Sequence, residues 1–203
     1  MVDLSHLSEV EIKEILKLQE RLSLLESQDK CKDSFMEYVR YIWPAFIEGD
    51  HHRLIADRLT QVSRGELKRL IVNMPPRHTK SEFASVYFPS WMMGLRPDMK
   101  IMQTTHTADL SINFGRKVRN LMDTEEYSQV FTDVKLAADS KSAGKWQTNR
   151  GGEYFAAGVG GAIAGRGADL LIIDDPHSEQ DALSLNLLDS CYEWYTSGPR
   201  QRL

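Results

Sequence analysis

The sequence predicts an α/β fold in which a mostly parallel sheet is flanked by helices on both faces. Two short apolar runs typical of buried strands, residues 70–72 and 170–173, carry this prediction, and each leads into polar residues. Segments with helical periodicity lie between the runs, and such alternation is typical of a parallel sheet. A chain of 203 residues is long enough for one domain of this kind with a helical extension.

The first 33 residues are predicted to form that extension, ahead of the domain proper at residues 34–203. Ser8 followed three residues later by Glu11 is a capping-box pattern, which marks a helix start. We expect the apolar face of this helix to pack on the chain's own domain, and contact with a partner protein is the alternative. That face consists of residues spaced by three and four: Ile15, Leu18, Leu22 and Leu25.

The remaining elements follow from periodicity, caps and turn residues. A helix that starts at Ser34 is expected to end at Trp43, because the following Pro44 disfavours helical backbone before it. The run after Lys80 and Ser81 has a helical pattern as well. Later elements are a strand at residues 99–104, a helix at 108–123 capped by Thr107, an inserted β-hairpin with its turn at 149–152, and a last helix at 178–195.

Residues 73–81, just after the first strand-type run, form the first candidate functional motif. A helix N-terminus offers free backbone N–H groups and partial positive charge to an anion. A Lys there can reach the outer phosphates of a nucleotide, and a Ser hydroxyl can ligate Mg²⁺. A surface loop with a chance Lys-Ser pair explains the segment equally well when it is taken alone. The pattern predicts a phosphate-binding loop with these contact residues: Pro76, Arg77, His78, Thr79, Lys80 and Ser81.

This loop departs from the usual P-loop pattern, because Met74 and Thr79 occupy the positions of its two glycines. Glycine accepts positive φ and close backbone approach, and a β-branched Thr does so only with strain. Either Thr79 takes positive φ at a cost of about 1–2 kcal/mol, or the loop is rearranged and φ stays negative. We expect the rearranged loop, with weak ATP binding.

The second candidate motif is the carboxylate pair Asp174 and Asp175, at the end of the apolar run 170–173. Ligands of open α/β sheets bind outside the carboxyl ends of the strands. We expect Ser81 and Asp174 to hold Mg²⁺ and Asp175 to activate the attacking water. An Asp-Asp-Pro turn that only ends a strand is the alternative.

Two arginines are candidates for stabilising charge on the transferring phosphate: Arg77 in the loop and Arg166 in the glycine-rich segment 158–167. The alternatives are simple phosphate binding for Arg77 and a salt bridge within the loop for Arg166. We favour Arg77 for the catalytic role.

Four segments, taken together, resemble the ATPase domain of the large terminase subunit of tailed bacteriophages: residues 73–81, 108–119, 157–169 and 170–176. The resemblance extends over roughly residues 40 to 203. It implies a P-loop ATPase that uses ATP and Mg²⁺ and assembles as a homo-oligomeric ring on the portal protein of a procapsid. Such a motor drives double-stranded DNA inward, works with a small terminase subunit, and acts in the cytoplasm of the infected bacterial host.

The same resemblance has two further implications. His52 precedes the loop where related ATPases place an adenine-contacting residue, and an ordinary surface pair with His51 is the alternative. Family members usually continue into more of the ATPase sheet and then a nuclease domain of the RNase H type. We therefore expect this chain to be a fragment without nuclease activity, since no spaced acidic cluster follows Asp181.

The composition narrows the choice of partners. With 25 Lys and Arg against 29 Asp and Glu, the net charge of −4 is not that of a protein that coats DNA. DNA contact would depend on local patches, such as those around Arg69 and Arg116, for which a solvated helix face is the alternative. No apolar stretch approaches the length needed to span a bilayer, so we expect no membrane role.

Two functions from other classes stay open. The first is a nucleotide-binding assembly module that does not hydrolyse ATP, which the Thr79 substitution favours. The second is a helicase-like translocase unrelated to packaging. Stimulation of ATPase activity by single-stranded nucleic acid, in place of portal or procapsid, would distinguish the second.

Overall fold

The computed structural model describes residues 8–139, 142–163 and 165–203. The α-helices are α1 (Glu9–Asp33), α2 (Phe35–Ile42), α3 (Asp50–Ser63), α4 (Lys80–Glu82), α5 (Phe88–Leu95), α6 (Ala108–Met122), α7 (Glu125–Val130) and α8 (Leu185–Ser197). The strands are β1 (Lys100–Thr105), β2 (Lys145–Gln147), β3 (Glu153–Gly158) and β4 (Leu170–Ile173). A π-helical turn, η1 (Phe83–Tyr87), and two 3₁₀ turns, η2 (Asp181–Leu183) and η3 (Pro199–Arg202), complete the elements.

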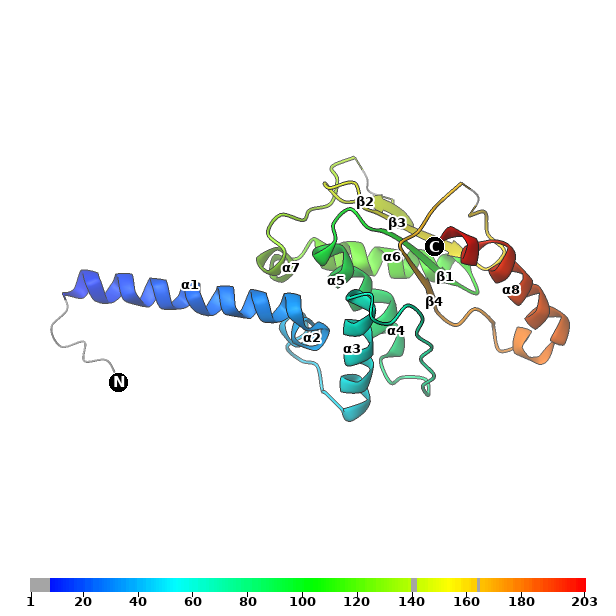
Figure 1. Cartoon of the computed structure of the whole chain (residues 1–203), viewed down its shortest axis with the longest axis horizontal. Coiled ribbons are helices and arrows are strands. Elements are labelled where there is room, and N and C mark those ends of the chain that lie inside the picture. Colours follow the sequence, from blue (N-terminus) through cyan, green and yellow to red (C-terminus); the bar gives the residue numbers. More distant parts are fainter. Residues whose placement is uncertain (1–7, 140–141, 164) are drawn as a thin grey trace.

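The four strands form one open sheet in the order β2, β3, β1, β4 (Figure 1). β1 lies in the middle and runs parallel to both β3 and β4, whereas β2 is antiparallel to β3. The predicted α/β class with a mostly parallel sheet is therefore confirmed, and so is the inserted hairpin. Gly151 in the hairpin turn has a φ of 87°, a conformation that favours glycine.

The two faces of the sheet are covered differently. On one face Ile101 and Tyr154 belong to the main core, which residues of α2, α3, α5, α6 and α7 complete. On the other face Met102 packs with Ile163 and Ala168, which lie in the coil that joins β3 to β4. In the described part of the chain, the buried apolar contacts of this second face thus come from coil, where the sequence predicted helices.

The predicted strand at residues 70–72 is not formed. Leu70 and Val72 pack partly against the main core, while Ile71 between them is 86% exposed. This alternation is that of an extended segment, yet the segment joins no strand in the described part of the sheet. Pro75 and Pro76 follow two residues after the segment and have no N–H to donate to a neighbouring strand.

β4 is consequently an edge strand, paired with β1 alone among the described strands. The strand predicted at residues 170–173 is formed, but only Ile172 of its four residues is buried and the others are half-buried, so the prediction that it is buried throughout is wrong. The last helix also begins later than predicted, at Leu185. Before it, Ser178 and Asp181 bond each other's backbone N–H groups through their side chains, at 3.0 and 3.1 Å. Such reciprocal bonds stabilise a local turn.

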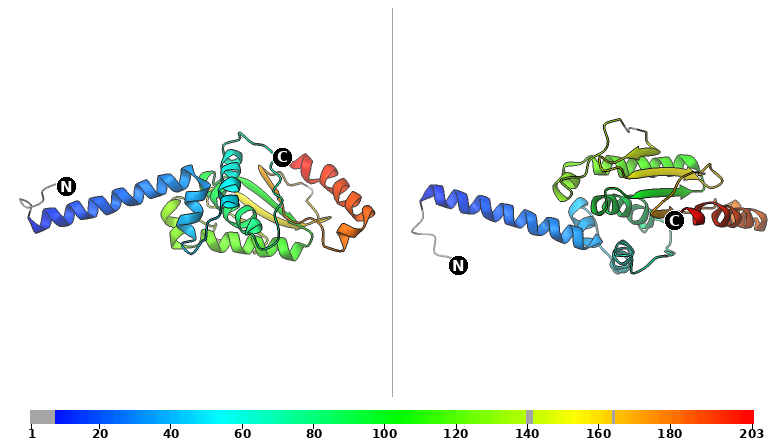
Figure 2. Two further views of the ribbon diagram at one scale, coloured as in Figure 1. Left: turned by 90° about the horizontal axis from the view of Figure 1, so that it is seen from below. Right: turned by 45° about the horizontal axis from the view of Figure 1, so that its top comes forward.

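α1 begins with the predicted capping box, in which Ser8 and Glu11 bond each other's backbone. Most of the helix then extends away from the domain (Figures 1 and 2), and only its last turns pack on α2 and α7. Leu18 and Leu22 are 61% and 57% exposed. The expectation that this apolar face packs on the chain's own domain is therefore wrong. No helix in the described residues has the length and apolarity needed to cross a membrane.

Candidate functional site

The loop and the acidic strand end meet at the carboxyl edge of the sheet, as the two motifs predict. The ammonium of Lys80, the first residue of α4, forms an ion pair with Asp175. Its Nζ also lies 3.3 Å from Oδ1 of Asp174. Two carboxylates that follow β4 therefore share one cation from the loop.

Asp174 is a buried carboxylate, 6% exposed, whose two oxygens have different partners. One oxygen faces Lys80, and the other accepts a hydrogen bond of 3.0 Å from the Ser85 hydroxyl. Gln103 in β1 donates in turn from Nε2 to the Ser85 oxygen at 3.2 Å. This relay fixes the plane of the carboxylate before any ligand contacts it, which is how supporting residues orient an ion ligand.

The serine that contacts Asp174 is Ser85, whereas the sequence assigned the hydroxyl beside this carboxylate to Ser81. Ser81 lies one turn earlier, in the first turn of α4, and is half-buried. Ser85 lies within the π-helical turn η1, where the Phe88 N–H donates to the Phe83 carbonyl five residues back. Pro89 follows and has no N–H for the Ser85 carbonyl, which disfavours regular α-helical bonding here.

Asp175 differs from its neighbour in being exposed, with 64% of its side chain accessible. Its φ of 43° is rare for a residue other than glycine, and such strain concentrates at functional sites. The backbone N–H of His106, which follows β1, donates to the Asp175 carbonyl at 3.2 Å and helps to hold this turn. The carboxylate therefore lies where it can contact both Lys80 and solvent.

Lys80 remains a cation in this setting. Burial lowers its pKa, but the bonds and charges of Asp175 and Asp174 more than offset burial, and the pKa lies above the usual value for a lysine. A protonated amine between two carboxylates also relieves the repulsion that the adjacent acids would otherwise exert on each other.

The loop before Lys80 contains two residues other than glycine with positive φ: Arg77 at 64° and Thr79 at 61°. Our expectation that Thr79 keeps a negative φ is therefore wrong. A backbone with alternating left-handed residues can turn its N–H groups toward a common anion, which is the geometry that phosphate loops use. The Arg77 side chain is exposed, and His78 bonds the Pro76 carbonyl through Nδ1 at 2.8 Å.

Thr79 is held in this strained conformation by hydrogen bonds from both sides. His52 Nδ1 accepts from the Gly49 N–H at 2.9 Å, so the ring proton lies on Nε2. Nε2 then donates to the Thr79 hydroxyl at 2.6 Å, and this hydroxyl donates to the His78 carbonyl at 2.6 Å. The chain of bonds is complete only when His52 is neutral.

His52 thus supports the loop from behind, through bonds to both of its ring nitrogens. The ring is 6% exposed and lies against the aromatic rings of Phe46 and Phe83. The predicted contact of His52 with adenine stays a prediction. Burial, reinforced by the neighbouring His51, lowers the pKa of His52 below its usual value, which favours the neutral ring.

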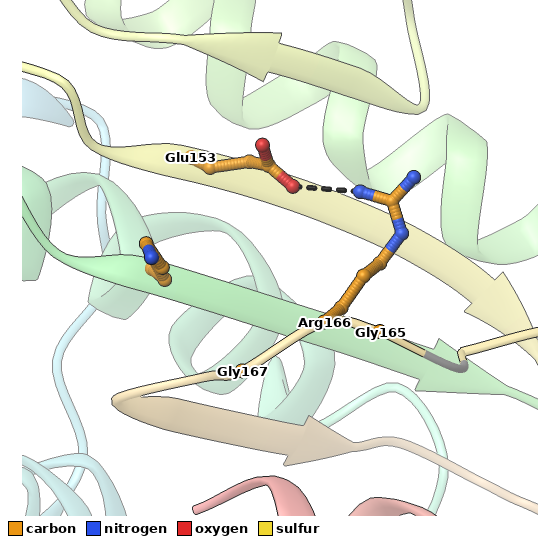
Figure 3. Close-up of a pocket in the computed structure, with 5 residues that line it drawn as sticks. Glu153, Gly165, Arg166 and Gly167 are labelled. Carbon is orange, nitrogen blue, oxygen red and sulfur yellow. Dashed lines mark hydrogen bonds and ion pairs between the residues drawn. The ribbon is translucent and has the colours of Figure 1, made fainter.

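Arg166 lies away from these residues, in a pocket of about 330 Å³ lined by Lys100, Glu153, Gly165, Arg166 and Gly167 (Figure 3). Its guanidinium forms an ion pair of 2.7 Å with Glu153 and lies 3.9 Å from the centre of the Phe155 ring. Glu153 begins β3 and is in register with the first residue of β1. Asp174 lies beyond the other end of β1, whose six residues span roughly 16 Å. Arg166 therefore forms a salt bridge, as the alternative interpretation held, but its partner lies in β3 and not within the loop.

Two residues that support the acids were missed in the sequence, Ser85 and Gln103. Gln103 had a visible signal, because it is a long polar residue within a segment predicted to be a strand and must find a partner when buried. Ser85 had none, since a serine on a helix face is common. No protein-family model, curated protein or solved structure matches this chain.

Proposed function

We propose that this chain is the ATP-binding and ATP-hydrolysing domain of a DNA-packaging motor of the terminase type. The observation that carries the proposal is the position of Lys80, which comes from a positive-φ loop at a helix start and lies between two carboxylates that end a parallel strand. Loop lysine, helix start and acidic strand end are the parts from which phosphoryl-transfer sites are built.

Each residue has a separate role in this proposal. Lys80 binds the β- and γ-phosphates, and the exposed Arg77 stabilises charge on the γ-phosphate. Asp174 and the Ser81 hydroxyl are the groups that would hold Mg²⁺, and Ser85 keeps the carboxylate oriented. Asp175 orients and deprotonates the attacking water, which its exposure favours. Mg²⁺ when bound neutralises phosphate charge.

The residues fit such an ion, because a buried carboxylate with one oxygen fixed by Ser85 presents its other oxygen toward the loop. Without nucleotide, the charge of Lys80 balances both carboxylates. When the Lys80 ammonium moves to a bound phosphate, the negative charges of Asp174 and Asp175 are left without a partner. A divalent cation at Asp174 restores the balance. Nucleotide and Mg²⁺ should therefore bind cooperatively, each raising the affinity for the other.

The motor role rests on the resemblance, which also suggests the partners: double-stranded DNA, the portal protein, the small terminase subunit and further copies in a ring, in the bacterial cytoplasm. On the chain itself, α6 presents basic residues beside the loop helix, since Lys117 pairs with Glu82 at 3.0 Å. Motion of α4 on hydrolysis would thus reach α6 directly.

Calorimetric titration with ATP and Mg²⁺ tests the binding step. Lys80→Ala should abolish binding while the chain stays folded by circular dichroism, and Lys135→Ala, an exposed lysine elsewhere, should bind as the parent does. Equal affinity of Lys80→Ala and the parent would refute the assignment of the phosphate loop.

A second candidate is a nucleotide-binding assembly module without turnover. The paired state of Lys80 favours it, because the cation must leave Asp175 before it can bind phosphate. Single-turnover measurement of phosphate release from bound ATP separates the motor from the module, since the module binds ATP and releases no phosphate.

A further inference from the structure

α1 presents an apolar stripe that no part of the described domain covers. Leu18, Leu22 and Leu25 are 61%, 57% and 48% exposed. The helix is attached only near its end, where Cys31 is buried and Gln28 donates to the Gln129 carbonyl at 2.6 Å. In both views of Figure 2 the rest of α1 lies apart from the domain. Helices in water owe most of their stability to packing of an apolar face, so a partner is needed for this one.

The spacing of the stripe identifies the kind of partner. Ile15, Leu18, Leu22 and Leu25 are separated by three, four and three residues, which is the a and d spacing of a two-stranded coiled coil. Ile15 and Leu22 occupy a positions, and Leu18 and Leu25 occupy d positions. In parallel coiled coils a β-branched residue at a with Leu at d favours two strands over larger bundles, and Ile15 and Leu18 are such a pair, whereas Leu22 is not β-branched.

The flanking charges favour a second copy of the same helix in parallel orientation. In this register Arg21 is a g residue and Glu26 is the e residue five positions later. Parallel pairing brings Arg21 of one copy next to Glu26 of the other, twice per dimer. Antiparallel pairing would bring the two Arg21 side chains together. Arg21 forms no ion pair with any residue that the structure describes, so it is available for such a contact.

We propose that α1 is a dimerisation helix that pairs, parallel and in register, with α1 of a second copy of this chain. The seam is two heptads long, so the dimer of the isolated chain is weak and forms at high concentration. The inference does not depend on nucleotide binding, because its residues are separate from the loop and the acids.

Disulfide trapping in the full chain tests the register. Leu18→Cys places a thiol at a d position, where a parallel in-register pair brings the two sulfurs together. Glu20→Cys is the matched control, since residue 20 is exposed on the opposite, f face of the same helix. Under mild oxidation Leu18→Cys should form a covalent dimer at a rate well above that of Glu20→Cys, and the parent, whose Cys31 and Cys191 are both buried, should form little. Equal trapping of the two variants would overturn the proposal.

A charge swap tests the partner. Sedimentation of the parent at chain concentrations up to about 1 mM should show dimer, and Arg21→Glu should weaken it by roughly tenfold because two attractions become two repulsions. The double variant with Arg21→Glu and Glu26→Arg should recover the parent affinity. A parent that stays monomeric over this range, or a double variant that is no better than Arg21→Glu, would also overturn the proposal. All these side chains are exposed, so the variants should fold.

Discussion

His52 donates a hydrogen bond of 2.6 Å to the hydroxyl of Thr79 and thereby stabilises a left-handed threonine where phosphate loops usually have glycine. A buried ring on α3 is in this way coupled to the backbone that precedes Lys80. The strain at Thr79 is of order 1–2 kcal/mol, and hydrogen bonds worth about 0.5–1.5 kcal/mol each are sufficient to offset it.

The first prediction is that Thr79→Gly does not improve ATP binding. Glycine removes the strain, but it also removes the acceptor for the buried His52 N–H, and an unpaired buried donor costs about 1–3 kcal/mol. We expect the dissociation constant measured by calorimetry to stay the same or rise by up to roughly tenfold. Thr79→Ser, which keeps the hydroxyl, is the control and should retain most of the affinity. Tenfold tighter binding by Thr79→Gly would show that the hydroxyl contributes nothing.

The second prediction concerns pH. Because burial lowers the pKa of His52, the folded state favours the neutral ring and binds fewer protons than the unfolded chain. This contribution to stability is complete above the ordinary histidine pKa of about 6.5 and is lost as the pH falls through the lower folded value. Urea midpoints of the parent should therefore fall between about pH 7 and pH 5. His52→Gln should show a flatter profile, and an identical slope would contradict this role.

The third prediction separates the two carboxylates. Asp175→Asn should keep nucleotide binding and slow single-turnover hydrolysis by about 10²- to 10⁴-fold, the usual contribution of a general base. Asp174→Asn should mainly reduce the Mg²⁺ dependence of binding, because Asp174 is the buried, oriented acid. Unchanged hydrolysis in Asp175→Asn would mean that another group activates the water.

The fourth prediction distinguishes Ser81 from Ser85. Ser85→Ala leaves the buried Gln103 amide and one Asp174 oxygen without their partner, and should reduce the free energy of unfolding by about 1–3 kcal/mol. Ser81→Ala should leave unfolding nearly unchanged and weaken Mg²⁺-dependent binding instead. Denaturant titrations and calorimetry on both variants measure the two effects, and the reverse pattern would exchange the roles assigned here.

Features of the fold that depend on residues adjacent in sequence were predicted more reliably than those that depend on distant residues. The capping box at Ser8, the Thr107 cap and the hairpin turn were predicted correctly, since neighbouring residues determine them. The prediction of a strand at residues 70–72 was wrong. Its apolar pattern indicates an extended segment but cannot show whether another strand lies within hydrogen-bonding distance.

The candidate site shows the same limit. Lys80, Asp174 and Asp175 were found because each ends a recognisable run of residues. The partner of His52 could not be found, since a contact between residues 27 positions apart depends on how α3 packs against the loop. Steric rules favour a negative φ for Thr79, and the tertiary hydrogen bond from His52 explains why the positive value is stable here.

The fifth prediction compares the two arginines. Arg77 is exposed in the loop, whereas Arg166 is paired with Glu153 at the opposite end of the parallel strands. Arg77→Ala should therefore slow single-turnover hydrolysis, because an arginine that contacts the transferring phosphate contributes about 10³- to 10⁵-fold to the rate. Arg166→Ala should hydrolyse ATP at the parent rate and lose at most about 1 kcal/mol of unfolding free energy, the usual worth of a partly exposed ion pair. If Arg166→Ala were as slow as Arg77→Ala in a dilute, monomeric sample, the pairing with Glu153 would have to break during turnover. If the loss appeared only at concentrations where copies associate, Arg166 would instead act on the site of a neighbouring copy.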